Sequence, residues 1–172
     1  MKTKLLLFVT ILTIVLSALM PSVALAAPPT QFSAIVIPTN IQLLSETPLG
    51  HSGRLLAKEQ VTGFIPYSTW SLLSYATAEM DATTNYIELP TGERKGVMRG
   101  RMVITSWNPD YTVAGTLELT YVARISGPGG MTFEGNWTAV HKTGVFKGIN
   151  ARGRFFSDPA QHIPPTLVGT YK

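Results

Sequence analysis

Apolar and polar side chains alternate along YTVAGTLELTYVARI, residues 111–125 of the chain. The odd-numbered positions are apolar or glycine, and most even-numbered positions are Thr, Glu or Arg. Because successive side chains of a β-strand point to opposite faces, this pattern predicts one strand with a buried face and a solvent-facing one. One-sided strands of this kind are typical of antiparallel sheets. At about 3.3 Å per residue the strand spans roughly 50 Å, which is long for a globular protein.

Further strand signals flank this segment on both sides. Residues 96–107 and 131–142 predict two more long strands, and turn residues separate each of them from it. We also expect strands at 31–38, 54–65 and 85–89, and a loop at 38–53 with one helical turn at 41–45. Residues 68–80 fit a strand by their alternation and a helix by the spacing of Trp70, Leu73 and Met80. Their β-branched and aromatic content favours the strand.

Glycines interrupt the long strands at positions 96, 100, 115 and 135. Long strands that contain glycine bend, and strands that bend around one apolar face close into a barrel. The chain has no cysteine, so packing and hydrogen bonding must hold this domain together without disulfides. We therefore predict an all-β fold, in the form of a single antiparallel β-barrel.

The first residues predict export from the cytoplasm. Lys2 and Lys4 precede an apolar run at 5–20, and residues 24–26 are Ala-Leu-Ala, the small-residue pattern that a signal peptidase cleaves. The run has 16 residues, whereas a stable membrane span needs about 20. We expect residues 1–26 to be a cleaved signal peptide and residues 27–172 to be one secreted domain, extracellular or periplasmic, with no stable membrane span after cleavage.

The charge is modest but unevenly distributed. Without Lys2 and Lys4 there are 12 basic and 10 acidic residues, a balance that argues against a nucleic-acid partner. Two short stretches hold eight of the basic residues: Arg94, Lys95, Arg99, Arg101, Lys142, Lys147, Arg152 and Arg154. They are either solvated outward faces of strands or, if the stretches are adjacent in space, a basic patch that attracts anionic glycans or lipid headgroups.

A glycine-rich run follows the strand predicted at 131–142. It begins TGVFKG at residues 143–148 and continues to Gly153, which favours a tight reversal with Phe146 tucked inward. The run resembles the closing hairpin of β-barrels of the allene oxide cyclase and dirigent type, with Lys142 standing where that family often has glycine. Residues 91–100 are similar to glycine-spaced strands of small barrels in the same group, so the resemblance covers about residues 91–156. It implies an up-and-down, calycin-like barrel of about eight strands with an apolar interior.

The chain carries no recognisable catalytic constellation. It lacks a Gly-x-Ser-x-Gly elbow and the histidine or cysteine spacing of metal sites, so we expect no catalytic residue, metal or cofactor. His51 and His162 fall in predicted loops, whereas His141 shares the parity of the apolar strand face. Glu79, Glu118 and Glu134 fall on outward parities, which gives no support to an acid–base role inside the barrel.

The inner face of the predicted barrel is rich in aromatic side chains. It carries the candidate ligand-binding residues Tyr111, Leu117, Leu119, Tyr121, Phe133, Trp137 and His141. These residues either fill the core or enclose one small apolar ligand, with space left by Gly115, Gly135 and Ala139 and with Tyr121 or His141 as a polar anchor.

The sequence favours a secreted, non-catalytic barrel that binds a small hydrophobic molecule in its interior. A first alternative is an isomerase or cyclase of the allene oxide cyclase and dirigent type, which would need a polar group pointing inward, such as Glu79, Arg101 or His141. A second alternative is an extracellular interaction protein that binds anionic surfaces through the basic patch.

Overall fold

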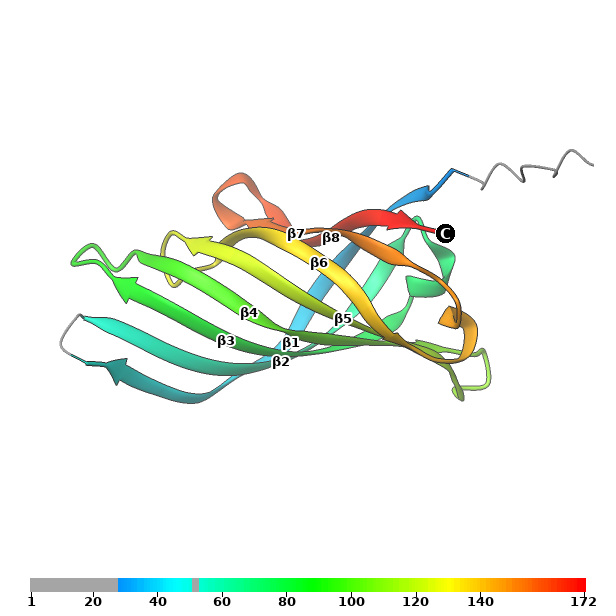
Figure 1. Cartoon of the computed structure of the whole chain (residues 1–172), viewed down its shortest axis with the longest axis horizontal. Helices are drawn as coiled ribbons and strands as arrows, with labels where there is room; N and C mark the ends of the chain where they lie inside the picture. Colours follow the sequence, from blue (N-terminus) through cyan, green and yellow to red (C-terminus); the bar gives the residue numbers. More distant parts are fainter. Residues whose placement is uncertain (1–27, 51–52) are drawn as a thin grey trace, which may run out of the picture.

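A computed structural model describes residues 28–50 and 53–172, and its sheet contains eight strands in chain order (Figure 1). The strands are β1 (Thr30–Leu49), β2 (Arg54–Ser68), β3 (Ala76–Glu88), β4 (Arg94–Trp107), β5 (Val113–Ser126), β6 (Thr132–Lys142), β7 (Ala151–Asp158) and β8 (Ile163–Tyr171). Neighbours are antiparallel, and β1 pairs with β8 as well as with β2, so the sheet closes into an up-and-down barrel. The predicted all-β barrel is confirmed.

Two sequence predictions fall on residues outside the described ranges, namely the signal peptide at 1–26 and the loop position of His51. Within the described ranges, no helix has the length and apolarity needed to cross a membrane.

Strand β1 is far longer than the sequence predicted. The loop expected at 38–53 is wrong for residues 38–49, and so is the helical turn at 41–45, because β1 continues to Leu49 and pairs with β2 from Ala34 to Leu49. Register shifts near Ile35, Pro38 and Leu43 accommodate the extra residues, as β-bulges do in edge strands that contain proline. The resulting β1–β2 hairpin extends well past the β7–β8 hairpin at one end of the barrel (Figure 1).

Residues 68–80 form neither the single strand nor the helix considered from the sequence. Strand β2 ends at Ser68, a short 3-10 helix, η1 (Ser71–Leu73), reverses the chain, and β3 begins at Ala76. The Ser68 hydroxyl accepts a hydrogen bond from the Trp70 backbone N–H at 3.1 Å, and Tyr75 adopts a positive φ of 62°. This turn directs Trp70 and Leu73 into the barrel, where both are buried.

One end of the barrel is closed by a plug. The glycine-rich run forms a second 3-10 helix, η2 (Gly144–Phe146), and Phe146 is fully buried against the edge of the Trp70 ring, with centroids 5.7 Å apart. Gly115 makes this approach possible, because a Cβ there would lie 2.8 Å from the Val145 backbone nitrogen. The inward Phe146 is therefore confirmed, whereas the space expected at Gly115 is taken by the plug.

We expect Phe146→Ala to lower the free energy of unfolding by about 3–5 kcal/mol, because it leaves a cavity that rigid strands cannot collapse to fill. The matched control is Val145→Ala, a partly exposed neighbour in the same 3-10 helix, which should change stability by no more than about 0.5 kcal/mol. Urea denaturation followed by tryptophan fluorescence measures both. Equal losses for the two variants would contradict the assignment of Phe146 as the plug.

Candidate functional site

The interior of the barrel is packed at the plugged end and opens into a cavity at the other. The cavity has a volume of about 710 Å³. Its wall is mainly apolar and comes from seven strands and two connections, with Val61, Met80, Met98, Met102, Phe133 and Phe155 among the residues that line it. Methionine side chains are flexible and polarisable, so this wall can adapt to molecules of different shape.

The cavity opens where β1 and β8 part. Their ladder runs from Thr30 opposite Tyr171 to Ile35 opposite Thr166. The next two residues of β8 toward the opening are Pro165 and Pro164, which have no N–H to donate and cannot extend a ladder. Beyond Ile35, β1 therefore leaves β8 and continues with β2 alone, and the gap leads into the cavity, whose lining includes Pro38, Pro164 and Pro165.

A polar cluster lies next to the cavity, around a small hollow that shares Glu59 and Met98 with the cavity wall. Tyr86 donates a hydrogen bond to the Glu46 carboxylate, and the Arg94 guanidinium lies 4.7 Å from the Tyr86 ring centroid. Arg94 also pairs with Glu88 at 2.9 Å. Burial, followed by the hydrogen bond to Glu46, raises the pKa of Tyr86 to about 12, so this hydroxyl remains a neutral donor near neutral pH. The Arg94 guanidinium therefore has two partners, the Glu88 carboxylate and the Tyr86 ring.

Phe133 is the one residue of the predicted ligand set that lines the cavity. Leu117, Leu119, Tyr121 and Trp137 are inward and buried, but they belong to the packed core around the cavity. Tyr121 lies over Gly100, with its hydroxyl 3.3 Å from the Asp81 carbonyl oxygen. Burial and then the nearby carboxylates of Asp81 and Glu59 raise the pKa of Tyr121.

The inward orientation predicted for Tyr111 and His141 is wrong. Tyr111 has a positive φ of 64° in the turn before β5 and is 87% exposed. His141 stands opposite Glu118, whereas Ala139 stands opposite Leu119, so Val140 is an extra residue that forms a bulge. Because a bulge inverts the alternation that follows it, His141 points outward and is exposed.

The sequence analysis missed Glu59. Its carboxylate lines the cavity from β2, on the same strand face as the buried residues Ala57, Val61 and Ile65. The sequence does indicate this orientation, because the apolar residues of 54–65 that face inward are at odd-numbered positions and Glu59 is at one of them too. Glu79 and Glu134, by contrast, are exposed as predicted.

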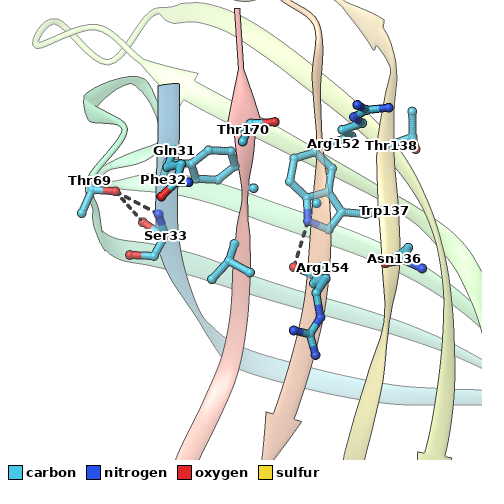
Figure 2. Close-up of a pocket in the computed structure, with 13 residues that line it drawn as sticks. Gln31, Phe32, Ser33, Thr69, Asn136, Trp137, Thr138, Arg152, Arg154 and Thr170 are labelled. Atoms are coloured by element: carbon cyan, nitrogen blue, oxygen red, sulfur yellow. Dashed lines mark hydrogen bonds between the residues drawn. The ribbon is translucent and has the colours of Figure 1, made fainter. Parts of the chain in front are cut away.

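A groove of about 790 Å³ lies on the outer surface over β6, β7, β8 and β1 (Figure 2). Its walls carry polar side chains, including Gln31, Asn136, Thr138, Arg152, Arg154 and Thr170. Its floor is thin, because Gly153 and Gly169 stand opposite each other and have no side chains. The Trp137 indole lies behind this floor and donates a hydrogen bond to the Arg154 carbonyl oxygen at 3.0 Å (Figure 2).

The two basic stretches share an outer face only in part. Arg101 on β4 lies in register with Thr120, Thr138 and Arg152, so three strand spacings, about 14 Å, separate Arg101 from Arg152. Arg101 pairs with Asp81 and Glu118, and Arg154 pairs with Glu134. Within the described residues, Arg152 has no carboxylate within 4.0 Å.

The remaining basic residues lie apart from the groove. Arg94 is engaged next to the cavity, the Lys142 ammonium lies 3.4 Å from the Asn150 side-chain oxygen, and Lys147 is exposed next to η2. Lys95 and Arg99 are exposed on β4.

Comparison of the chain with protein-family models and with curated proteins gives no match to either. In the part of the chain that the structure describes, no group of three or more His, Cys, Asp or Glu residues is placed to hold a metal ion. The apolar cavity and the outer groove are therefore the two candidate binding sites.

We expect Gly169→Ala to lower the free energy of unfolding by about 1–3 kcal/mol, because the new methyl group would lie 2.6 Å from Cζ2 of Trp137. The shifted indole should also change the tryptophan emission spectrum. The control is Thr170→Ala, the next residue of the same strand, whose side chain faces the groove and whose loss should cost no more than about 0.5 kcal/mol. A Gly169→Ala variant as stable as this control would show that the glycine is not needed to accommodate Trp137.

Proposed function

We propose that this protein is secreted and binds a small hydrophobic molecule in the cavity at the open end of the barrel, without converting it chemically. The observation that carries the proposal is the apolar cavity of about 710 Å³. Pockets for small molecules commonly measure about 300–1,000 Å³ and combine an apolar lining with a few polar groups. The wall here has this composition, with Glu59, Ser157 and His162 as polar members.

The distribution of side-chain size supports the proposal. An eight-stranded barrel is just wide enough to be filled by its own side chains or to hold one small ligand. The plugged end is filled with bulky residues such as Trp70, Leu73 and Phe146. In the cavity wall, Ala78 of β3 presents only a methyl group to the interior, which is too small to fill that space.

The resemblance to the allene oxide cyclase and dirigent barrels is consistent with this function, since eight antiparallel strands in chain order are the architecture that it implies. A cyclase or isomerase would need a polar group inside the barrel. Glu79, Arg101 and His141, the residues considered for that role, are exposed on the outer surface. Glu59 is an inward carboxylate, but within the described residues it has no hydrogen-bonded partner that would form an acid–base pair with it, so binding without conversion is the function that we favour.

We expect the protein, purified after expression of the full chain, to bind the fluorescent apolar probe N-phenyl-1-naphthylamine saturably, with one probe molecule per protein chain. Met80→Trp places a larger ring in the cavity wall and should weaken probe binding by about tenfold or more, or about 1.4 kcal/mol. The control is Val140→Trp, an exposed position outside the cavity, which should bind the probe as the unmodified protein does. Circular dichroism establishes that both variants are folded.

No saturable binding by the unmodified protein would refute the proposal. Equal affinities for the two tryptophan variants would place the bound probe outside the cavity.

The outer groove supports a second candidate function, binding of anionic glycans or lipid headgroups. The specific observation is Arg152, which lines a groove rich in hydroxyl and amide groups and has no ion pair among the described residues. Hydroxyl and amide groups suit the oxygen atoms of a glycan, and a free guanidinium suits its sulfate or carboxylate groups.

If the groove binds anions, Arg152→Glu will elute from a heparin column at a distinctly lower salt concentration than the unmodified protein. Lys147→Glu makes the same change in net charge at an exposed position outside the groove, so it should shift elution much less. Equal shifts for both variants would indicate attraction by net charge alone and would count against a groove site.

A further inference from the structure

Glu59 is an ionisable side chain placed on the apolar face of the sheet. It follows Ala57 and precedes Val61 on the inward side of β2, and both of these neighbours are buried. Glu59 itself is half-buried and lines the cavity. The only other ionisable residue among the described residues that line the cavity is His162, which is exposed on the β7–β8 connection.

The inward neighbours of Glu59 leave its carboxylate uncovered. Ala82 of β3 stands opposite Glu59, and Gly100 of β4 stands opposite Ala82. A methyl group and a hydrogen atom cannot cover a carboxylate, so nothing from these two strands separates the charge from the cavity. The Tyr121 ring occupies the space over Gly100, and its hydroxyl is directed to the Asp81 carbonyl oxygen.

Within the described residues, Glu59 has no hydrogen bond or ion pair to its side chain, whereas several other carboxylates of the sheet have one. Glu88 pairs with Arg94, Glu134 pairs with Arg154, and Glu46 accepts the Tyr86 hydrogen bond. Arg94 lines a small hollow together with Glu59, but its guanidinium is already held between Glu88 and the Tyr86 ring and forms no ion pair with Glu59. Lys58, the chain neighbour of Glu59, is exposed on the other side of β2.

An unpaired carboxylate on an apolar wall is unfavourable, because it loses hydration without gaining a partner. A bound cation would supply the missing charge-assisted hydrogen bonds, and a bound carboxylate would add repulsion. The methionine and phenylalanine side chains around Glu59 would contact the apolar part of the same molecule. A single guest with one positive end and one apolar body fits both features.

We propose that the cavity selects cationic amphiphiles, with Glu59 binding a protonated amine or quaternary ammonium head group and the methionine-rich wall holding the apolar tail. This inference rests on the proposed binding of a small hydrophobic molecule, and it adds the chemical class of that molecule. Glu59 is then the residue that determines specificity.

The test compares dodecylamine, dodecanol and dodecanoate, three probes with one tail and different charges, at neutral pH and below their micellar concentrations. Each displaces N-phenyl-1-naphthylamine from the protein purified after expression of the full chain. The unmodified protein should bind dodecylamine about tenfold more tightly than dodecanol, and dodecanoate more weakly than either. Glu59→Gln should abolish the preference for the amine, so that dodecylamine and dodecanol then bind with similar affinity.

Two variants control for charge elsewhere. Glu79→Gln makes the same chemical change on the outer surface and should keep the preference for the amine. Glu134→Gln makes the same change at a second exposed carboxylate of the sheet, outside the cavity, and should also keep the preference.

The outcomes separate this inference from the function on which it rests. If dodecanol and the other probes all fail to displace the dye, hydrophobic binding in the cavity is refuted, and the inference with it. If dodecanol binds but dodecylamine binds no better than dodecanoate, the cavity binds apolar molecules and the role of Glu59 is refuted. A preference for the amine that survives in Glu59→Gln would likewise overturn the assignment.

Discussion

The six residue pairs between β1 and β8 are the constraint on which the rest of the structure depends, because they alone turn an eight-stranded sheet into a closed barrel. Their inner side is covered by aromatic rings. The Phe32 ring lies 5.1 Å from the Trp70 ring and 5.8 Å from the Trp137 ring, and Trp70 stacks on Tyr171 at 4.2 Å. Offset and tilted contacts of this kind add to the stabilisation from apolar burial, so the short ladder is reinforced where the barrel closes. Its length also sets the size of the opening, since the ladder stops where Pro165 would be the next partner.

Glycine positions determine where the interior is filled. Gly153 and Gly169 leave room for the Trp137 indole, and Gly115 leaves room for the backbone of the plug. In each case a large group occupies the space that the missing side chain provides. Gly63 likewise leaves room for the backbone of β1 at Ile37, whereas the small side chain of Ala78 faces the cavity and leaves space there.

Much of the fold was predictable from local pattern, because alternation and turn residues report directly on one-sided strands. Residues 96–107, 111–125 and 131–142 correspond to β4, β5 and β6 within a few residues. The errors arise where pairing with a distant segment overrides the local signal. Pro38 and Pro48 suggested a loop, yet pairing with β2 and bulges keep this segment extended. The bulge at Val140, which reverses His141, depends on the register against β5 and leaves no signature in the local sequence.

The candidate site was less predictable than the fold, because which inward residues reach a cavity depends on how every strand bends. The inward orientation of Glu59 could have been predicted from its parity alone, but its role in the site depends on its neighbours in three dimensions.

The two faces of the sheet differ in how charge is compensated. On the outer face, Asp81 and Glu118 pair with Arg101, so charge there is compensated locally. Arg94 has the inward parity of β4 and lines a small hollow with Glu59, but Glu88 and the Tyr86 ring already hold it. A single sheet separates the outer face from the cavity, and alternation keeps the other arginines of β4 and β7 on the outer side. They cannot serve as partners for a carboxylate on the inner face. No hydrogen bond or ion pair among the described residues depends on the Glu59 carboxylate, so a glutamine at this position would remove the charge from the cavity wall without breaking such a contact. Glu59 places an ionisable side chain at an apolar position of β2, beside a cavity and without a hydrogen bond or ion pair among the described residues. Departures of this kind from the apolar pattern are expected at binding sites.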